Sequence, residues 1–150
     1  MGKGSILIVL ALLLSTLYSC SSEPKVGEVT DEPMTITVWE GESLEGTYTG
    51  ETLEGIPEGT GTFLYEDGDR SLEYTGEFKD GTLSGKGTLD CTFFMVHFTS
   101  GADKGLNREG HYNGDVLDGI PSGTGSFSAI NGDGEPYTYT GEWKNGLYDG

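Results

Sequence analysis

Apolar and polar residues alternate along most of the chain, as they do in β-strands that bury one face. Tyr74, Gly76 and Phe78 are two positions apart, so they share one face of a strand. Gly85 and Gly87 follow the same rule on the expected return strand. Glycine in a strand is less favourable than alanine by about 0.5 to 1 kcal/mol, so its regular placement indicates a compensating gain. We expect aromatic rings to lie across the glycine gaps of the neighbouring strand.

This alternation belongs to an internal repeat. In each copy, glycine follows a tyrosine at 2, 7, 11 and 13 positions. Three full copies begin at Tyr48, Tyr74 and Tyr112, and a truncated fourth begins at Tyr139. The residue pairs expected to form tight turns are Asp67-Gly68, Asp80-Gly81 and Asn145-Gly146. The sequence therefore predicts an all-β fold, an elongated single-layer antiparallel meander of hairpins.

The copies resemble the MORN repeat, most clearly at residues 74 to 81 and 139 to 146. The resemblance covers residues 46 to 150 and implies an array of β-hairpins. Thr52 and Val116 depart from the pattern, because the family places an aromatic residue at these positions. MORN proteins are in general associated with membrane attachment and protein assembly. Some also carry a lipid kinase domain, but the resemblance implies no kinase here, since the sequence has no such domain.

Two apolar segments lie outside the repeats. Alternation from Met34 to Val38 predicts a capping strand within residues 34 to 45, at the N-terminal end of the array. Residues 91 to 98 form an apolar run between the second and third copies. We expect this run to prolong the second return strand, with a polar loop at residues 100 to 108.

The first twenty residues have the pattern of a secretory signal. Lys3 precedes an apolar run at residues 6 to 14, and small polar residues follow it. The run is well short of the roughly 20 residues that span a bilayer core. Residues 17 to 20, Leu-Tyr-Ser-Cys, resemble the lipobox of bacterial lipoproteins, in which the cysteine becomes the lipidated N-terminus. An ordinary cleaved signal is the alternative.

The lipobox resemblance implies a signal peptide at residues 1 to 19 and a lipidated N-terminus with a flexible tether at residues 20 to 33. Cys20 is then the lipid-attachment residue, with palmitate among its acyl chains. We expect the chain on the exported side of a bacterial cell membrane or outer membrane, held there by these acyl chains. With Cys20 modified, Cys91 has no intramolecular partner, and we expect it to be a buried structural residue.

Composition narrows the function classes. The chain has 150 residues, enough for one domain, and 26 of them are glycine. Its 25 acidic and 8 basic side chains give a formal net charge of −17. A surface this acidic repels nucleic acid, so we expect no nucleic-acid partner. Aromatic residues make up 11% of the chain, which is more than a disordered acidic tail would carry.

Candidate groups for catalysis or metal binding are few. His97 lies in an apolar run, His111 precedes a repeat tyrosine, and neither belongs to a known motif, so a structural role is expected for His97. The sequence has no nucleophile elbow, phosphate-binding loop or zinc-protease motif. Acidic residues gather at residues 66 to 73 and 133 to 135, where oxygen ligands suit Ca²⁺, but neither cluster matches a calcium loop. We therefore expect solvated turns, no metal, no cofactor and no catalytic activity.

Aromatic residues at repeated positions are the candidate binding face. They are Tyr48, Tyr74, Phe78, Tyr112, Tyr139 and Trp143. Packing within the sheet also explains them, and both roles are compatible if a concave aromatic groove receives an extended peptide or a helix. The sequence thus predicts a membrane-anchored, non-catalytic binding or scaffolding module at the cell envelope, with a protein or peptide partner.

Two alternatives to this function remain open. The repeats could recognise a lipid surface directly, although the few basic residues argue against anionic lipid. The chain could also be a hydrolase that uses acidic pairs on the sheet.

Overall fold

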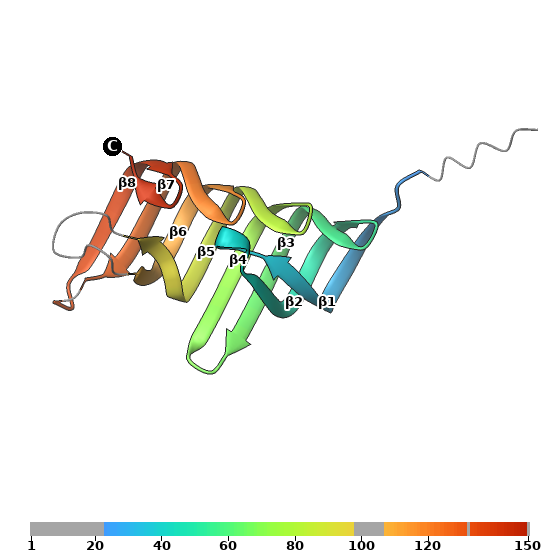
Figure 1. Cartoon of the computed structure of the whole chain (residues 1–150), viewed down its shortest axis with the longest axis horizontal. Helices are drawn as coiled ribbons and strands as arrows, with labels where there is room; N and C mark the ends of the chain where they lie inside the picture. Colours follow the sequence, from blue (N-terminus) through green and yellow to red (C-terminus); the bar gives the residue numbers. More distant parts are fainter. Residues whose placement is uncertain (1–22, 98–106, 132, 150) are drawn as a thin grey trace, which may run out of the picture.

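The computed structural model describes residues 23 to 97, 107 to 131 and 133 to 149, and nearly all of them lie in strands. Strands β1 to β9 pair in chain order to form one sheet, and consecutive strands are antiparallel. Their bounds are β1 (Val26–Thr37), β2 (Ser43–Leu53), β3 (Ile56–Asp67), β4 (Arg70–Lys79), β5 (Thr82–His97), β6 (Asn107–Leu117), β7 (Ile120–Ile130), β8 (Pro136–Lys144) and β9 (Leu147–Tyr148). Figure 1 shows the resulting elongated meander, with the hairpin ends curled along one long side. The predicted all-β meander is confirmed.

Tight turns join the strands within each repeat. At four of them, an acidic residue or asparagine with positive φ precedes a glycine with positive φ. These pairs are Glu54-Gly55, Asp80-Gly81, Asp118-Gly119 and Asn145-Gly146. Two consecutive residues with positive φ form the turn that matches the twist of antiparallel strands. The turn predicted between β3 and β4 is also present, at Gly68 (φ 61°).

The two faces of the sheet differ in character. The inner face carries the apolar side chains of the core, including Phe63, Leu72, Leu83 and Leu89, which are almost fully buried. The outer face carries the alternate positions, which are largely Thr, Ser, Asn, Glu and Asp. This division follows from the period of two in the sequence.

Tyrosine and glycine pack as the repeat predicts. A Cβ on Gly87 would lie 2.5 to 2.6 Å from ring and hydroxyl atoms of Tyr74, and Gly61 and Gly125 stand in the same relation to Tyr48 and Tyr112. Only glycine leaves room for these rings. The spacing of the repeat therefore pairs each tyrosine with a glycine on the next strand, and the ring fills the space left by the missing side chain.

The N-terminal part of the chain differs from the prediction. Strand β1 begins at Val26, so residues 26 to 33 are paired with β2 and do not belong to a flexible tether. Polar residues and Pro33 are typical of a linker, but β1 accommodates them in its pairing with β2 through a bulge at Asp31, whose φ is 50°. The capping strand therefore begins earlier than expected and ends at Thr37, and the last three residues of the expected segment, 43 to 45, belong to β2.

After β1, the chain crosses the inner face of the sheet. Thr37 forms a parallel bridge with Thr82, and its N–H donates to the carbonyl of Gly81 at 3.2 Å. The short 3-10 helix η1 (Trp39–Gly41) follows and lies over the middle strands in Figure 1. Val38 is 1% exposed and Trp39 7% exposed. Val38 and Trp39 therefore help to close the core.

The region between the second and third repeats agrees with the prediction in part. Strand β5 continues through the apolar run to His97, as expected. Strand β6 begins at Asn107, so the last two residues of the predicted loop lie in a strand. Residues 98 to 106 are outside the described part of the chain. Among the residues that the structure describes, no helix is long and apolar enough to span a membrane.

Candidate functional site

The aromatic residues predicted as a binding face lie on the inner face of the sheet. Tyr48, Tyr74 and Tyr112 are completely buried, Phe78 and Trp143 are 3% exposed, and Tyr139 is partly buried. Their rings meet edge to face, with centroids 4.9 to 5.2 Å apart in the pairs Tyr48–Phe78, Tyr74–Phe78, Tyr112–Trp143 and Tyr139–Trp143. This geometry is typical of core packing. A direct role of these rings in binding remains a prediction.

The tyrosine hydroxyls have structural partners. The Tyr48 hydroxyl donates to the carbonyl of Glu51 at 2.7 Å, and the Tyr112 hydroxyl donates to that of Asp115 at 2.7 Å. The Tyr74 hydroxyl donates to two carbonyls, those of Glu77 and Ser84, at 3.0 and 2.7 Å. Burial raises the pKa of Tyr48 to about 12 and also raises that of Tyr74 and Tyr112. These phenols therefore stay protonated near neutral pH, as hydrogen-bond donors.

The inner face is covered near its middle by the chain itself. Trp39 of η1 packs against Phe93 of β5, with ring centroids 5.7 Å apart. Arg70 lies over the Phe93 ring at 4.1 Å and pairs with Glu42 at 3.0 Å. These contacts hold Trp39 and Glu42 against the sheet. Tyr48, Tyr74 and Tyr112 belong to the same buried core cluster as Trp39, so a partner would have to displace buried side chains to reach their rings.

The outer face carries in-register rows of polar side chains. One row crosses seven strands with a hydroxyl or amide side chain at every step, because the strand pairing aligns these positions. Its members are Thr49, Thr62, Thr75, Thr88, Asn113, Ser126 and Thr140. Hydroxyl pairs within the row are 3.0 Å apart at Thr62–Thr75 and at Ser126–Thr140. The row stabilises the sheet through cross-strand hydrogen bonds.

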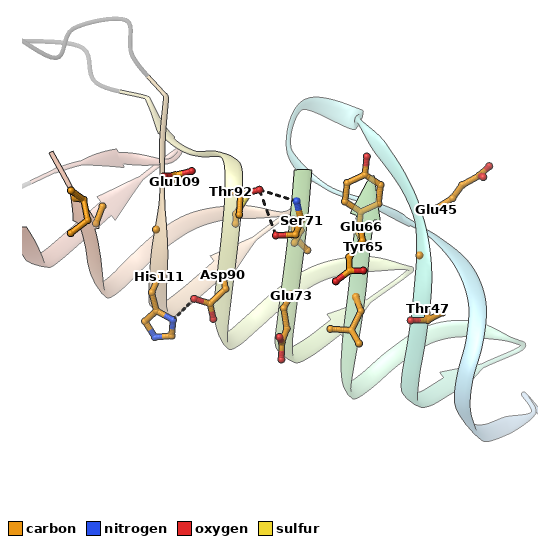
Figure 2. Close-up of a pocket in the computed structure, with 17 residues that line it drawn as sticks. Glu45, Thr47, Tyr65, Glu66, Ser71, Glu73, Asp90, Thr92, Glu109 and His111 are labelled. Atoms are coloured by element: carbon orange, nitrogen blue, oxygen red, sulfur yellow. Dashed lines mark hydrogen bonds and ion pairs between the residues drawn. The ribbon is translucent and has the colours of Figure 1, made fainter. Parts of the chain in front are cut away.

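Beside this row, on the side away from the tight turns, the outer face is hollowed into a groove of about 860 Å³. We call it the outer-face groove. Figure 2 shows its labelled polar side chains spread over adjacent strands. The outer-face side chains that line it are Glu45, Thr47, Leu64, Glu66, Ser71, Glu73, Asp90, Thr92, Glu109, His111 and Ile130. They come from β2 to β7, so the groove runs across the strands.

Carboxylates dominate the charge of the outer-face groove. Five of its lining side chains are acidic, and His111 is the only basic residue among the lining residues. Asp90 and His111 are opposite each other on β5 and β6, and His111 Nδ1 lies 2.8 Å from Asp90 Oδ1. Both side chains are about half exposed, so this pair is solvated. The groove also exposes two apolar side chains, Leu64 at 42% and Ile130 at 56%.

The groove presents exposed hydrogen-bond acceptors. Its lining carboxylates are all exposed. Besides the Asp90–His111 pair, a hydrogen bond joins β4 and β5 in the groove, where the Ser71 N–H donates to Thr92 Oγ1 at 2.9 Å. An array of exposed acceptors can bind a cationic or hydrogen-bond-donating ligand.

A second set of carboxylates has a structural role that the sequence reading missed. An acidic residue follows each repeat tyrosine at the third position, as Glu51, Glu77, Asp115 and Glu142. The Glu51 carboxylate accepts the N–H of Thr60 at 2.6 Å, and that of Asp115 accepts the N–H of Thr124 at 3.0 Å. These hydrogen bonds lower the pKa of Glu51; for Asp115, the hydrogen bond from Lys86 lowers it most. The recurrence at a fixed offset was the signal that could have revealed them.

The other sequence candidates lie in several places. Cys20 is outside the described residues, and Cys91 is a buried free cysteine. The backbone of His97 ends β5, but its side chain is outside the described part. Of the two acidic clusters, only the one at residues 66 to 73 reaches the outer-face groove. Among the side chains that the structure describes, no three His, Cys, Asp or Glu residues are placed to hold a metal ion.

Comparison with known families identifies the repeats. The MORN repeat model matches residues 46–70, 74–92, 112–134 and 139–150, which together are more than half of the chain. A comparison with curated proteins found no match. MORN repeats are typically non-catalytic binding modules, and the matched segments coincide with the hairpins of the sheet. The chain therefore belongs to the MORN-repeat family.

Proposed function

We propose that this chain is a membrane-anchored, non-catalytic binding or scaffolding module at the bacterial cell envelope. The outer-face groove is the observation that supports this function best, because it is a wide, polar and open surface on a continuous sheet. Nine paired strands keep such a surface in shape without a ligand, which lowers the ordering cost of binding.

The anchor in this proposal is an acylated Cys20. Val26, the first residue of β1, follows Cys20 by six residues. Six residues reach at most about 20 Å when fully extended. An anchored sheet would therefore stay close to the membrane surface, which suits a scaffold that gathers partners there.

Membrane attachment is tested by expressing the full chain in a bacterial host that is grown with radioactive palmitate. We expect label in the wild-type protein and recovery in the membrane fraction, and loss of both in a Cys20→Ser variant. Label that persists in the variant would contradict attachment at Cys20.

The binding role is tested by cross-linking the tagged full chain in envelopes of its own host. We expect a defined set of proteins enriched over an unrelated lipoprotein that carries the same anchor. An identical set for both proteins would refute the scaffold. Liposome binding by the Cys20→Ser chain would instead favour direct lipid recognition by the repeats.

A further inference from the structure

We infer that the outer-face groove binds an extended, lysine- or arginine-rich segment of a protein partner. The inference rests on the proposed binding function and names the partner's chemistry. It follows from the shape, the charge and the exposed apolar side chains of the groove.

The shape of the groove suits a chain segment. At about 860 Å³, it is near the upper end of the range for small-molecule sites, and it lies open across strands β2 to β7. An elongated ligand laid across the strands would meet one strand after another. Side chains at alternate positions of such a ligand would all point to the floor of the groove.

Four of the five carboxylates in the groove have no basic partner among the described residues. Glu73 of β4 and Asp90 of β5 are directly opposite each other in the register, and like charges at opposite positions destabilise a sheet. The ion pairs of the described residues involve none of these four, which are Glu45, Glu66, Glu73 and Glu109. A cationic ligand would relieve this repulsion, whereas an anionic lipid or nucleic acid would increase it.

The exposed apolar side chains of the groove favour lysine and arginine as the cationic residues of the partner. Leu64 is opposite Glu73 across β3 and β4, so an apolar and an acidic side chain lie side by side in the groove. Ile130 lies at the other end and is also exposed. Lysine and arginine combine an apolar stem with a charged head, so they can contact both kinds of side chain. A small inorganic cation would use the carboxylates alone.

The test uses the purified full chain in a neutral detergent and a fluorescein-labelled peptide of alternating lysine and glycine. Fluorescence anisotropy at low and physiological ionic strength measures the affinity. The groove variant is Glu66→Gln/Glu73→Gln. The matched control, Glu28→Gln/Glu32→Gln, removes the same charge from exposed residues of β1, which do not line the groove.

We expect the groove variant to bind the peptide about five- to tenfold more weakly than wild type, which is the effect of two solvated charge pairs. The control variant should bind within about twofold of wild type. Equal weakening in both variants would show attraction by net charge only and would overturn the inference, as would the absence of binding to the wild-type chain. Equal urea midpoints for all three proteins exclude unfolding as the cause.

A charge reversal sharpens the result. The variant Glu66→Lys/Glu73→Lys should lose the lysine peptide and gain affinity for a peptide of alternating glutamate and glycine. Without that gain, the groove is not the contact site. A failure of this inference can be told apart from a failure of the proposed function. If the wild type and the groove variant cross-link the same envelope proteins equally, the scaffold function stands and the assigned surface is wrong.

Discussion

The packing of tyrosine against glycine predicts a large effect of a single methyl group at Gly87. A Cβ at this position would lie 2.5 Å from Cε2 and the hydroxyl oxygen of Tyr74, and 2.6 Å from its Cζ. The ring is completely buried and its hydroxyl donates to the carbonyls of Glu77 and Ser84, so it has little room to move. Gly87→Ala must therefore shift the ring or separate the two strands.

The magnitude follows from these contacts. Overpacking a core residue destabilises a protein by about 1 to 3 kcal/mol. Displacing the Tyr74 hydroxyl would add about 1 kcal/mol, because its single proton is shared between the two carbonyls. Replacing glycine by alanine in a strand offsets about 0.5 to 1 kcal/mol of this loss. We expect Gly87→Ala to lower the free energy of unfolding by about 2 kcal/mol.

Urea unfolding, followed by the fluorescence of the buried Trp39 and Trp143, measures this effect. With a slope of about 2 kcal/mol per molar urea, the midpoint should fall by about 1 M. Gly55→Ala is the control, because a Cβ there meets nothing within 4 Å and only the positive φ of 82° is unfavourable. That variant should lose about 1 kcal/mol.

A double-mutant cycle identifies the cause. Tyr74→Leu removes the ring edge that the new methyl group would meet, so Gly87→Ala should be less destabilising by at least about 1 kcal/mol in that background. Additive effects of the two substitutions would refute the packing argument. So would a Gly87→Ala variant that is no less stable than Gly55→Ala.

Three further predictions concern stability. Trp39→Ala should lower the free energy of unfolding, measured by urea denaturation, by about 3 to 5 kcal/mol, because the buried indole packs on the inner face against Phe93. A loss below about 1 kcal/mol would show that Trp39 does not close the core. The folded-state pKa values of Glu51 and Asp115 lie below the ordinary carboxyl pKa of about 4, so their contribution to stability is complete above that pH. It should be lost as the pH falls through the folded-state pKa values, in thermal melts recorded across the acidic range. Asp115→Asn weakens the hydrogen bonds that Asp115 accepts from Lys86 Nζ and the Thr124 N–H. The variant should lose about 1 kcal/mol of folding stability near neutral pH, and its melting temperature should fall less steeply at acidic pH than that of the wild type. An unchanged dependence on acidic pH would contradict this role.

Much of the fold could be predicted because its determinants are local. The offsets between Tyr74, Gly76, Gly85 and Gly87 already specify which residues share a face and where each hairpin turns. The sequence predicts a tether at residues 20 to 33, since charges and a proline are typical of linkers, but residues 26 to 33 lie in β1. Their pairing with β2 is a tertiary contact that overrides the local signal.

The sequence by itself determined the repeat, its hairpins and the role of glycine beside each buried tyrosine, because these depend on spacings within a few residues. The tertiary structure alone decided which surface is open. Glu66, Asp90 and His111 meet in one groove because the register of strands β3 to β6 aligns them, although they are far apart along the chain. It also decided that Tyr48, Tyr74 and Tyr112 are completely buried, since their rings pack in one core cluster that includes Val38 and Trp39 of the segment after β1. A one-residue change in register would reverse the facing of every side chain in a strand, so the exposed surface depends on pairing that no single segment encodes.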